Sequence, residues 1–188
     1  VLASWESQRA NKYREVNNIS ATIGTAVNIQ AMVFGNIGEK SGTGVMFTRN
    51  PSTGVNHPFG EFMINAQGED VVAGIRNTLP ISNQMLLNSY AQTTPETTME
   101  KLWPEIFQEL VDVGLALELH YKDMQDIEFT IEQGKLWILQ TRSGKRSGKA
   151  TIKIAVDMVK SGIISISQSL AQINPDRLNS LLHPTIDS

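Results

Sequence analysis

Residues 126–142 alternate between apolar and polar side chains around a central glycine, a pattern that predicts a β-hairpin. Successive side chains of a strand point to opposite faces. The first strand therefore turns its apolar residues to one side and Asp126 and Glu128 to the other. The second strand is expected to run from Lys135 to about Thr141. These two strands commit this part of the chain to an antiparallel sheet.

The turn of the hairpin decides which polar side chains share a face. A two-residue turn at 133–134 would put Gln140 on the far side from Glu128. A three-residue loop at 132–134 would bring Gln140 back to the face of Glu128. We expect the three-residue loop, because it assigns positive φ to Gly134 alone. It pairs Asp126 with Gln140, and four polar side chains then share one face: Asp126, Glu128, Gln140 and Arg142.

This set of side chains suits a metal-bound polyphosphate. Carboxylate and amide oxygens are hard ligands of the kind that Mg²⁺ prefers, with phosphates and water completing its shell. Cross-strand neighbours lie about 5 Å apart at Cβ and diagonal ones about 7–8 Å, which is close enough to hold one ion. Arg142 would add a fork of donors for phosphate oxygens. From these residues alone, an exposed hairpin with a merely solvated polar face is the favoured explanation, because such alternation is ordinary in antiparallel sheets.

Composition narrows the class of protein. The chain has 188 residues, 40% hydrophobic content and a net charge of −3, values typical of a globular protein. It lacks the excess of basic residues that favours binding to nucleic acid. Cysteine is absent, which removes disulfides, thiolate metal sites and cysteine nucleophiles. No apolar run approaches ~18 residues and no signal peptide is visible, so we expect a cytoplasmic protein that does not bind membranes. Val1 lies within an expected helix, which suggests a piece excised from a longer polypeptide.

The order of the remaining segments predicts an α+β fold, with a mostly antiparallel sheet packed against helices and a short helical extension at the C-terminus. Strands are expected at 24–34, 45–48 and 59–65, and the clearest helix at 99–121. Further expected helices begin at Ser4, at residue 150 and, through a capping box with Gln168, at Ser165. A basic, glycine-rich connection at 143–149 divides the chain into parts 1–146 and 147–188.

Two other features of the sequence give weaker evidence for a functional site. Residues 42–44, Gly-Thr-Gly, lack the pattern of a phosphate-binding loop, and we expect a turn there. His57, His120 and His183 have no spaced second histidine or serine partner nearby in sequence. No nucleophile and base can therefore be assigned, and each histidine is expected to be structural or at the surface.

Five segments in a fixed order resemble the nucleotide-binding region of pyruvate, phosphate dikinase: residues 24–36, 41–54, 59–76, 123–132 and 139–146. The resemblance runs from about Leu2 to Pro184 and is far more specific than any single motif. It implies an ATP-grasp-like lobe. It also implies a parent enzyme that interconverts ATP, phosphate and pyruvate with AMP, pyrophosphate and phosphoenolpyruvate through a phosphohistidine on another domain.

The resemblance also assigns roles to residues. Glu128 and Gln140 would hold Mg²⁺ on the phosphates, with Asp126 supporting, and Arg142 would be the catalytic contact to the transferring phosphoryl groups. A further set would bind ATP elsewhere: Gln30, Met32 and Val33 lining the adenine between lobes, and Glu61 and Glu69 as additional contacts.

Departures from the family limit these expectations. The family's phosphorylated histidine lies in a Gly-Gly-x-Thr-Ser-His segment, which this sequence lacks. The expected partners are therefore an N-terminal lobe, a phosphohistidine domain and a pyruvate-binding barrel of the same polypeptide, in a homo-oligomeric parent. The 188 residues alone are predicted to be inactive in the overall reaction. A phosphoenolpyruvate synthase, an antibiotic phosphotransferase and a non-catalytic nucleotide-binding module remain as alternatives.

Overall fold

The computed structural model describes residues 2–73, 77–88 and 95–173. Contacts divide the chain into two units, Val1–Met32 and Val33–Ser188. In the first unit, a 3-10 turn at Leu2–Glu6 precedes helix α1 at Gln8–Val16. Ser7, not Ser4, caps this helix by accepting a hydrogen bond from Ala10 N at 3.3 Å. The 3-10 turn takes up the residues in front of Ser7 and moves the cap along the chain.

The strand expected at 24–34 is not formed. Residues 23–34 have neither helix nor strand, and Ile29 is 98% exposed. Alternation is present in this segment, but no strand in the described part of the chain pairs with it in the sheet. Because a strand is stabilised by its neighbours, the pattern alone does not produce one.

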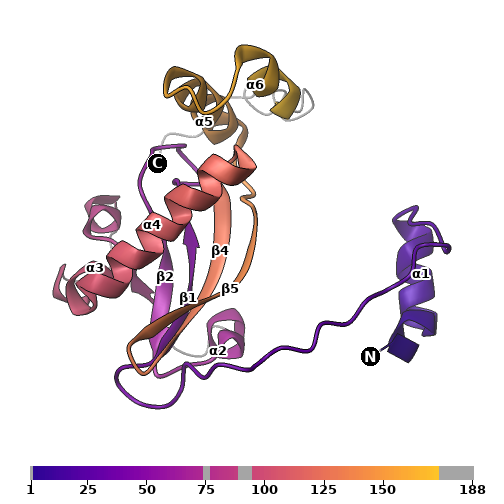
Figure 1. The fold of residues 1–188 in the computed structure, drawn as a ribbon, viewed down its shortest axis with the longest axis horizontal. Helices are drawn as coiled ribbons and strands as arrows, with labels where there is room; N and C mark the ends of the chain where they lie inside the picture. The colour runs from indigo at the N-terminus through magenta and orange to yellow at the C-terminus, as the bar shows by residue number, and fades with distance from the viewer. Residues whose placement is uncertain (1, 74–76, 89–94, 174–188) are drawn as a thin grey trace. The chain divides into compact units, whose positions relative to one another are not determined.

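The second unit is built around a five-stranded sheet (Figure 1). Its strands lie in the order β3-β2-β1-β4-β5, and every described pairing is antiparallel. The strands are β1 at Gly42–Phe47, β2 at Phe59–Ile64, β3 at Leu79–Pro80, β4 at Gln125–Glu132 and β5 at Lys135–Ser143. The α+β class is therefore confirmed.

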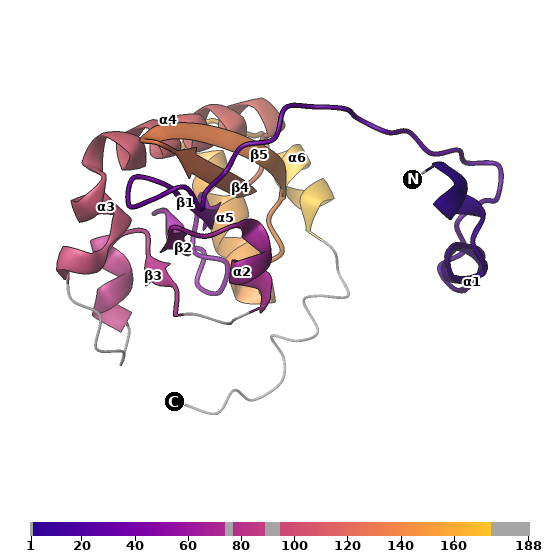
Figure 2. The same ribbon diagram turned by 90° about the horizontal axis from the view of Figure 1, so that it is seen from below.

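Helices lie on both sides of this sheet. Figure 2 shows α4 on one side and α2 and α5 on the other. The helices of this unit are α2 at Gly68–Ala73, α3 at Met99–Leu102, α4 at Pro104–Tyr121, α5 at Gly148–Lys160 and α6 at Ile166–Gln172, with 3-10 turns at Asn83–Asn88 and Pro95–Thr97. The capping box expected at Ser165 and Gln168 is present.

The helix expected at 99–121 is two helices. Trp103 separates α3 from α4 with φ −138° and ψ 65°, outside the helical region. Pro104 disfavours a helical residue before it and has no N–H to continue the first helix. It is instead the first residue of α4, a position that proline fits well.

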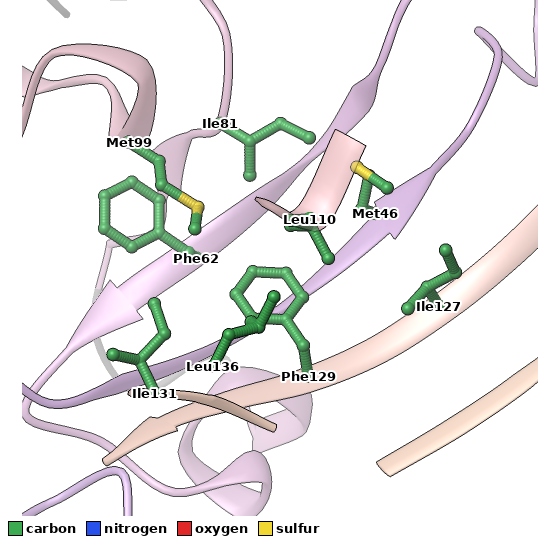
Figure 3. Close-up of a cluster of buried hydrophobic side chains, with 9 residues drawn as sticks. All are labelled: Met46, Phe62, Ile81, Met99, Leu110, Ile127, Phe129, Ile131 and Leu136. Carbon is green, nitrogen blue, oxygen red and sulfur yellow. The ribbon is translucent and has the colours of Figure 1, made fainter. Parts of the chain in front are cut away.

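The main core lies between the sheet and helices α3 and α4. Figure 3 shows Phe62 of β2 and Phe129 of β4 beside Leu110 of α4. Gly44 makes this packing possible, since a Cβ there would lie 2.7 Å from Phe129 Cζ and 2.6 Å from Glu61 O. The turn expected at 42–44 is therefore wrong. These residues open the central strand β1, where small residues leave room for two phenylalanines.

A second core forms under α5. Met124, Ile154 and Met158 are buried there, with Phe47 of β1 packed beside them. The apolar side of α5 thus packs close to one end of the sheet, and the division predicted after residue 146 remains a prediction. Among the described residues, none of the helices is long and apolar enough to span a membrane. The sequence also predicts a last turn that begins at Pro175, and this turn lies outside the described residues.

Candidate functional site

The hairpin turns through two residues, so the three-residue loop is wrong. Glu132 pairs with Lys135, which leaves Gln133 and Gly134 as the turn. Both have positive φ, 51° and 82°. This is the arrangement of a type I′ turn, whose twist matches that of the flanking strands. Gln133 therefore takes the left-handed conformation that we expected glycine alone to take.

A β-bulge in β5 nevertheless places the four polar side chains on one face. The register shifts between Glu128 and Phe129, and Leu139 has no partner on β4. A bulge inserts one extra residue into one strand and reverses the alternation beyond it. Glu128 consequently lies opposite Gln140 instead of Leu139, and Asp126 lies opposite Arg142. The shared face is confirmed, although its cause is the bulge and not the loop.

Arg142 binds the two carboxylates of β4 unequally. Its Nε lies 2.8 Å from Asp126 Oδ2, while its NH2 lies 3.6 Å from Glu128 Oε1. The Asp126 side chain is only 8% exposed, whereas Glu128 and Arg142 are 39% and 55% exposed. The hydrogen bond and charge of Asp126, and more weakly the charge of Glu128, raise the pKa of Arg142 above its ordinary value. The guanidinium is thus fixed at one edge and open to solvent at the other.

Glu61 lies in the same cross-strand row as Glu128. Both residues are opposite Val45 of β1, and residues directly opposite one another share a face. Strands lie about 4.8 Å apart, which separates the Glu61 and Glu128 backbones by roughly 10 Å. Glu61 accepts a hydrogen bond from the hydroxyl of Thr78. The sheet therefore brings Glu61 onto the polar face of the hairpin, two strands away.

Glu69 lies on a different element, on the same side of the sheet. It lies in the first turn of α2, which packs against β1, and its side chain is exposed. Figure 2 shows α2 and α5 on the same side of the sheet. Phe47, which packs beside the α5 cluster, faces the same way as Asp126, to which it is paired. The polar residues of the hairpin thus lie on the α2 and α5 side, away from α4.

The hairpin tip is tied to the segment that leads into β1. Phe34 N donates to Glu132 Oε1 at 2.9 Å, and Gly134 N donates to Lys40 O at 2.8 Å. Val33 precedes this attachment within the second unit, while Gln30 and Met32 lie in the first. The adenine contacts expected for these three residues therefore stay predictions.

The donor set on this face fits a hard cation that takes few protein ligands. The described residues contain no cluster of three or more His, Cys, Asp or Glu side chains that could hold a metal ion. Glu128 and Gln140 are directly opposite each other and offer a carboxylate and an amide oxygen. Mg²⁺ is commonly bound by one or two carboxylates together with substrate phosphates. The chemistry of Glu128 and Gln140 thus fits a Mg²⁺ ion whose remaining ligands are phosphate and water oxygens.

Comparison with known proteins decides the family. The family model "Pyruvate phosphate dikinase, AMP/ATP-binding domain" matches residues 1–84 and 81–162. The chain belongs to this family. Among named pyruvate, phosphate dikinases it is 57% identical to that of Rhizobium meliloti over 187 residues, which is 100% of this chain and 20% of that protein. It is 54% identical to the chloroplastic dikinase 1 of Arabidopsis thaliana over 98% of this chain and 18% of that protein. The chain thus spans about a fifth of the relatives it matches.

One polar cluster of this dikinase domain was missed by the sequence analysis. Arg49 Nε and NH2 donate to the two carboxylate oxygens of Glu118 at 2.8 and 2.9 Å. Thr48 Oγ1 donates to Glu118 Oε1 at 2.6 Å. The Arg49 and Glu118 side chains are 2% and 3% exposed. The available signal was the spacing of Glu118, which follows the buried Leu110 and Gly114 at intervals of four along α4.

Proposed function

We propose that this chain supplies the Mg·ATP-binding face of a pyruvate, phosphate dikinase. The observation that carries the proposal is the pair of cross-strand rows on one exposed face, Glu128 opposite Gln140 and Asp126 opposite Arg142. A carboxylate, an amide and a guanidinium in adjacent rows match the phosphates of a nucleotide and their metal. Family membership favours this use over a merely solvated hairpin face.

Arg142 is the phosphate-binding group in this proposal. Its Nε is occupied by Asp126 and its Nη2 lies 3.6 Å from Glu128 Oε1, while the side chain as a whole is 55% exposed. Asp126 therefore serves chiefly to orient the guanidinium, and less as a direct metal ligand. An oriented cation stabilises charge that develops on transferring phosphoryl oxygens without having to reorganise.

Glu128 and Gln140 would hold the Mg²⁺ that accompanies ATP. The bound ion would neutralise charge on the phosphate oxygens. Glu61, in the row of Glu128, and Glu69, on α2, are positioned as outer contacts to the nucleotide or its water shell. Residues 30–33 would line the adenine.

The phosphate acceptor belongs to another part of the parent enzyme. This sequence contains no Gly-Gly-x-Thr-Ser-His segment, so the histidine that would receive the phosphoryl group is not in this chain. The proposed reaction of the parent interconverts ATP, phosphate and pyruvate with AMP, pyrophosphate and phosphoenolpyruvate. A phosphohistidine domain and a pyruvate-binding barrel would complete it in a homo-oligomer. The 188 residues alone would bind nucleotide without completing that cycle.

A chimeric enzyme tests this proposal. The Rhizobium meliloti dikinase would carry this chain in place of its own matching 187 residues. We expect the chimera to form phosphoenolpyruvate from ATP, phosphate and pyruvate. Glu128→Gln should lower kcat/KM for ATP by about 10- to 100-fold, the size of a lost charged hydrogen-bond or metal contact. Glu109→Gln, the same change on an exposed position of α4, is the matched control.

Two results would decide against the proposal. Equal activity of the Glu128→Gln and Glu109→Gln chimeras would remove the hairpin from the nucleotide site. Activity that needs no phosphate would assign the segment to a synthase that uses water. Titration of the 188-residue chain with ATP, with and without Mg²⁺, supplies a direct binding measurement beside these assays.

A further inference from the structure

The two-residue turn of the β4–β5 hairpin favours one strand register, and the observed polar face requires another. A two-residue turn at Gln133 and Gly134, continued without a bulge, would pair Glu128 with Leu139. Gln140 and Arg142 would then point to the core side. The turn alone therefore does not place these two side chains on the site face. Some other contact has to favour the bulged register.

A side-chain hydrogen bond lies directly behind the Asp126–Arg142 pair. Thr141 Oγ1 donates to Gln125 Oε1 at 3.0 Å. The two residues each precede a member of the ion pair, so they face the opposite side of the sheet. Their register makes them diagonal neighbours across β4 and β5. The bond therefore ties together the same two strand segments that carry Asp126 and Arg142.

The amide of Gln125 is held in the orientation that this bond requires. Gln125 is 2% exposed, and its Nε2 donates to Asp123 O at 3.0 Å and to Met124 O at 3.2 Å. Both amide hydrogens are therefore used on backbone carbonyls. The Oε1 atom remains as a buried acceptor, and Thr141 supplies its donor. Loss of that donor would leave a buried polar atom unsatisfied.

Gln125 is in turn fastened to α4. Thr48 and Gln125 exchange two bonds of 3.0 Å, from Gln125 N to Thr48 Oγ1 and from Thr48 N to Gln125 O. Thr48 Oγ1 donates to Glu118, which also binds Arg49. Gly114, one turn earlier, lets α4 come close, because a Cβ there would lie 3.1 Å from Thr48 Cγ2. We name these residues the core-side network: Arg49, Thr48, Glu118, Gln125 and Thr141.

We infer that the core-side network selects the bulged register of β5 and thereby positions Gln140 and Arg142 on the site face. In the unbulged register Thr141 would point away from Gln125, and the buried Oε1 would lose its donor. The network lies on the α4 side of the sheet, opposite the proposed nucleotide face, so its members are positioning residues. The inference rests on the proposed function only for what the face binds.

Thr141→Val tests the inference in the 188-residue chain. The substitution keeps the shape of the side chain and removes the hydroxyl that donates to Gln125. We expect the population of the unbulged register to rise about tenfold, as for loss of a hydrogen bond to a buried acceptor. Chemical-exchange saturation transfer NMR measures that population. Cross-strand NOEs identify it, from Asp126 to Arg142 in the bulged register and from Glu128 to Leu139 in the other.

Three further variants separate register from stability. Thr141→Ser keeps the hydroxyl and should keep the bulged register. Thr98→Val removes another buried hydroxyl, which donates to Asn83 Oδ1 at 2.9 Å away from the hairpin, and should change stability without changing register. Deletion of Leu139 lets a two-residue turn place Gln140 opposite Glu128 with no bulge. Thr141→Val should therefore leave the register unchanged in that deletion background.

The outcomes are distinct. Equal register populations in Thr141→Val and Thr98→Val would overturn the inference. So would an equal effect of Thr141→Val with and without Leu139. Mg·ATP affinity of Arg142→Gln, measured beside these variants, separates the two proposals. Unchanged affinity in Arg142→Gln would overturn the assignment of the nucleotide to this face, and the register populations of the Thr141 variants would still test the positioning network.

Discussion

Two of the arginine–carboxylate pairs among the described residues lie on opposite sides of the same sheet. Arg142 and Asp126 meet at 2.8 Å on the site face, with Arg142 55% exposed. Arg49 and Glu118 meet at 2.8 and 2.9 Å beneath α4, both about 97% buried or more. Their contact distances are nearly equal. Their environments differ, and environment decides how much each pair contributes to stability and whether it can bind a ligand.

The buried pair is fixed in place, whereas the exposed pair keeps donors available. Removing two charges from water costs several kcal/mol per ion, so a buried pair contributes to geometry more than to net stability. Arg49 NH1 has no hydrogen-bond partner among the described residues, which adds to that cost. Because Arg142 stays largely in water, its charge loses little hydration. Its remaining N–H groups can still reach a phosphate. Arg49–Glu118 is therefore suited to structural placement, whereas Arg142–Asp126 keeps donors exposed for the proposed phosphate contact.

The largest expected effect comes from breaking the buried pair. Arg49→Met leaves the Glu118 carboxylate buried without its cation, and we expect the free energy of unfolding to fall by about 3–5 kcal/mol. Urea denaturation followed by far-UV circular dichroism measures the change. The double variant Arg49→Met with Glu118→Leu removes both charges and should recover most of the loss. A double variant as unstable as Arg49→Met would show that packing, not the unpaired charge, causes the effect.

Breaking the exposed pair should affect ligand binding more than stability. For Arg142→Gln we expect a loss of about 1–1.5 kcal/mol in unfolding free energy, because Arg142 is largely exposed but its partner Asp126 is only 8% exposed. Mg·ATP affinity should fall by roughly 10- to 100-fold, because a charged hydrogen bond to phosphate contributes about 1.5–3 kcal/mol. Calorimetric titration measures the affinity. Arg142→Lys keeps the charge but not the fork, so an affinity equal to the original would contradict bidentate binding.

A smaller change at the turn alters the hairpin and leaves both ion pairs in place. Gln133 has φ 51°, and asparagine tolerates that conformation better. We expect Gln133→Asn to raise the free energy of unfolding by about 0.5–1 kcal/mol. Mg·ATP affinity should stay the same, because the substitution leaves the register and both pairs in place. A gain in affinity would mean that hairpin stability, and not the contacts of Arg142, limits binding.

Alternation predicted the shared face of the hairpin correctly, but it could not predict how the face arises. The two-residue type I′ turn, with Gln133 in the left-handed region, shifts the pairing of β5 by one residue relative to the expected loop. The bulge at Leu139 shifts it by one more residue, and two such shifts return the same side chains to the same face. Neither local choice is visible in the pattern, since both depend on contacts across the sheet. Residues 24–34 show the converse, because they alternate as well as β4 does but have no described partner strand. Glu118 escaped notice because its partner, Arg49, lies 69 positions away in the chain.

The smallest expected effect concerns pH. The Asp126 hydrogen bond and charge raise the pKa of Arg142. A group with a raised pKa contributes its full stability below its unfolded pKa and loses it only as pH rises through the folded value. For an arginine that window lies above pH ~12.

The difference in unfolding free energy between the original chain and Arg142→Gln should therefore be constant from pH 6 to 9. Urea denaturation at four pH values checks this. A difference that shrinks within that range would show that the stability effect of Arg142→Gln does not come from loss of the Arg142–Asp126 pair.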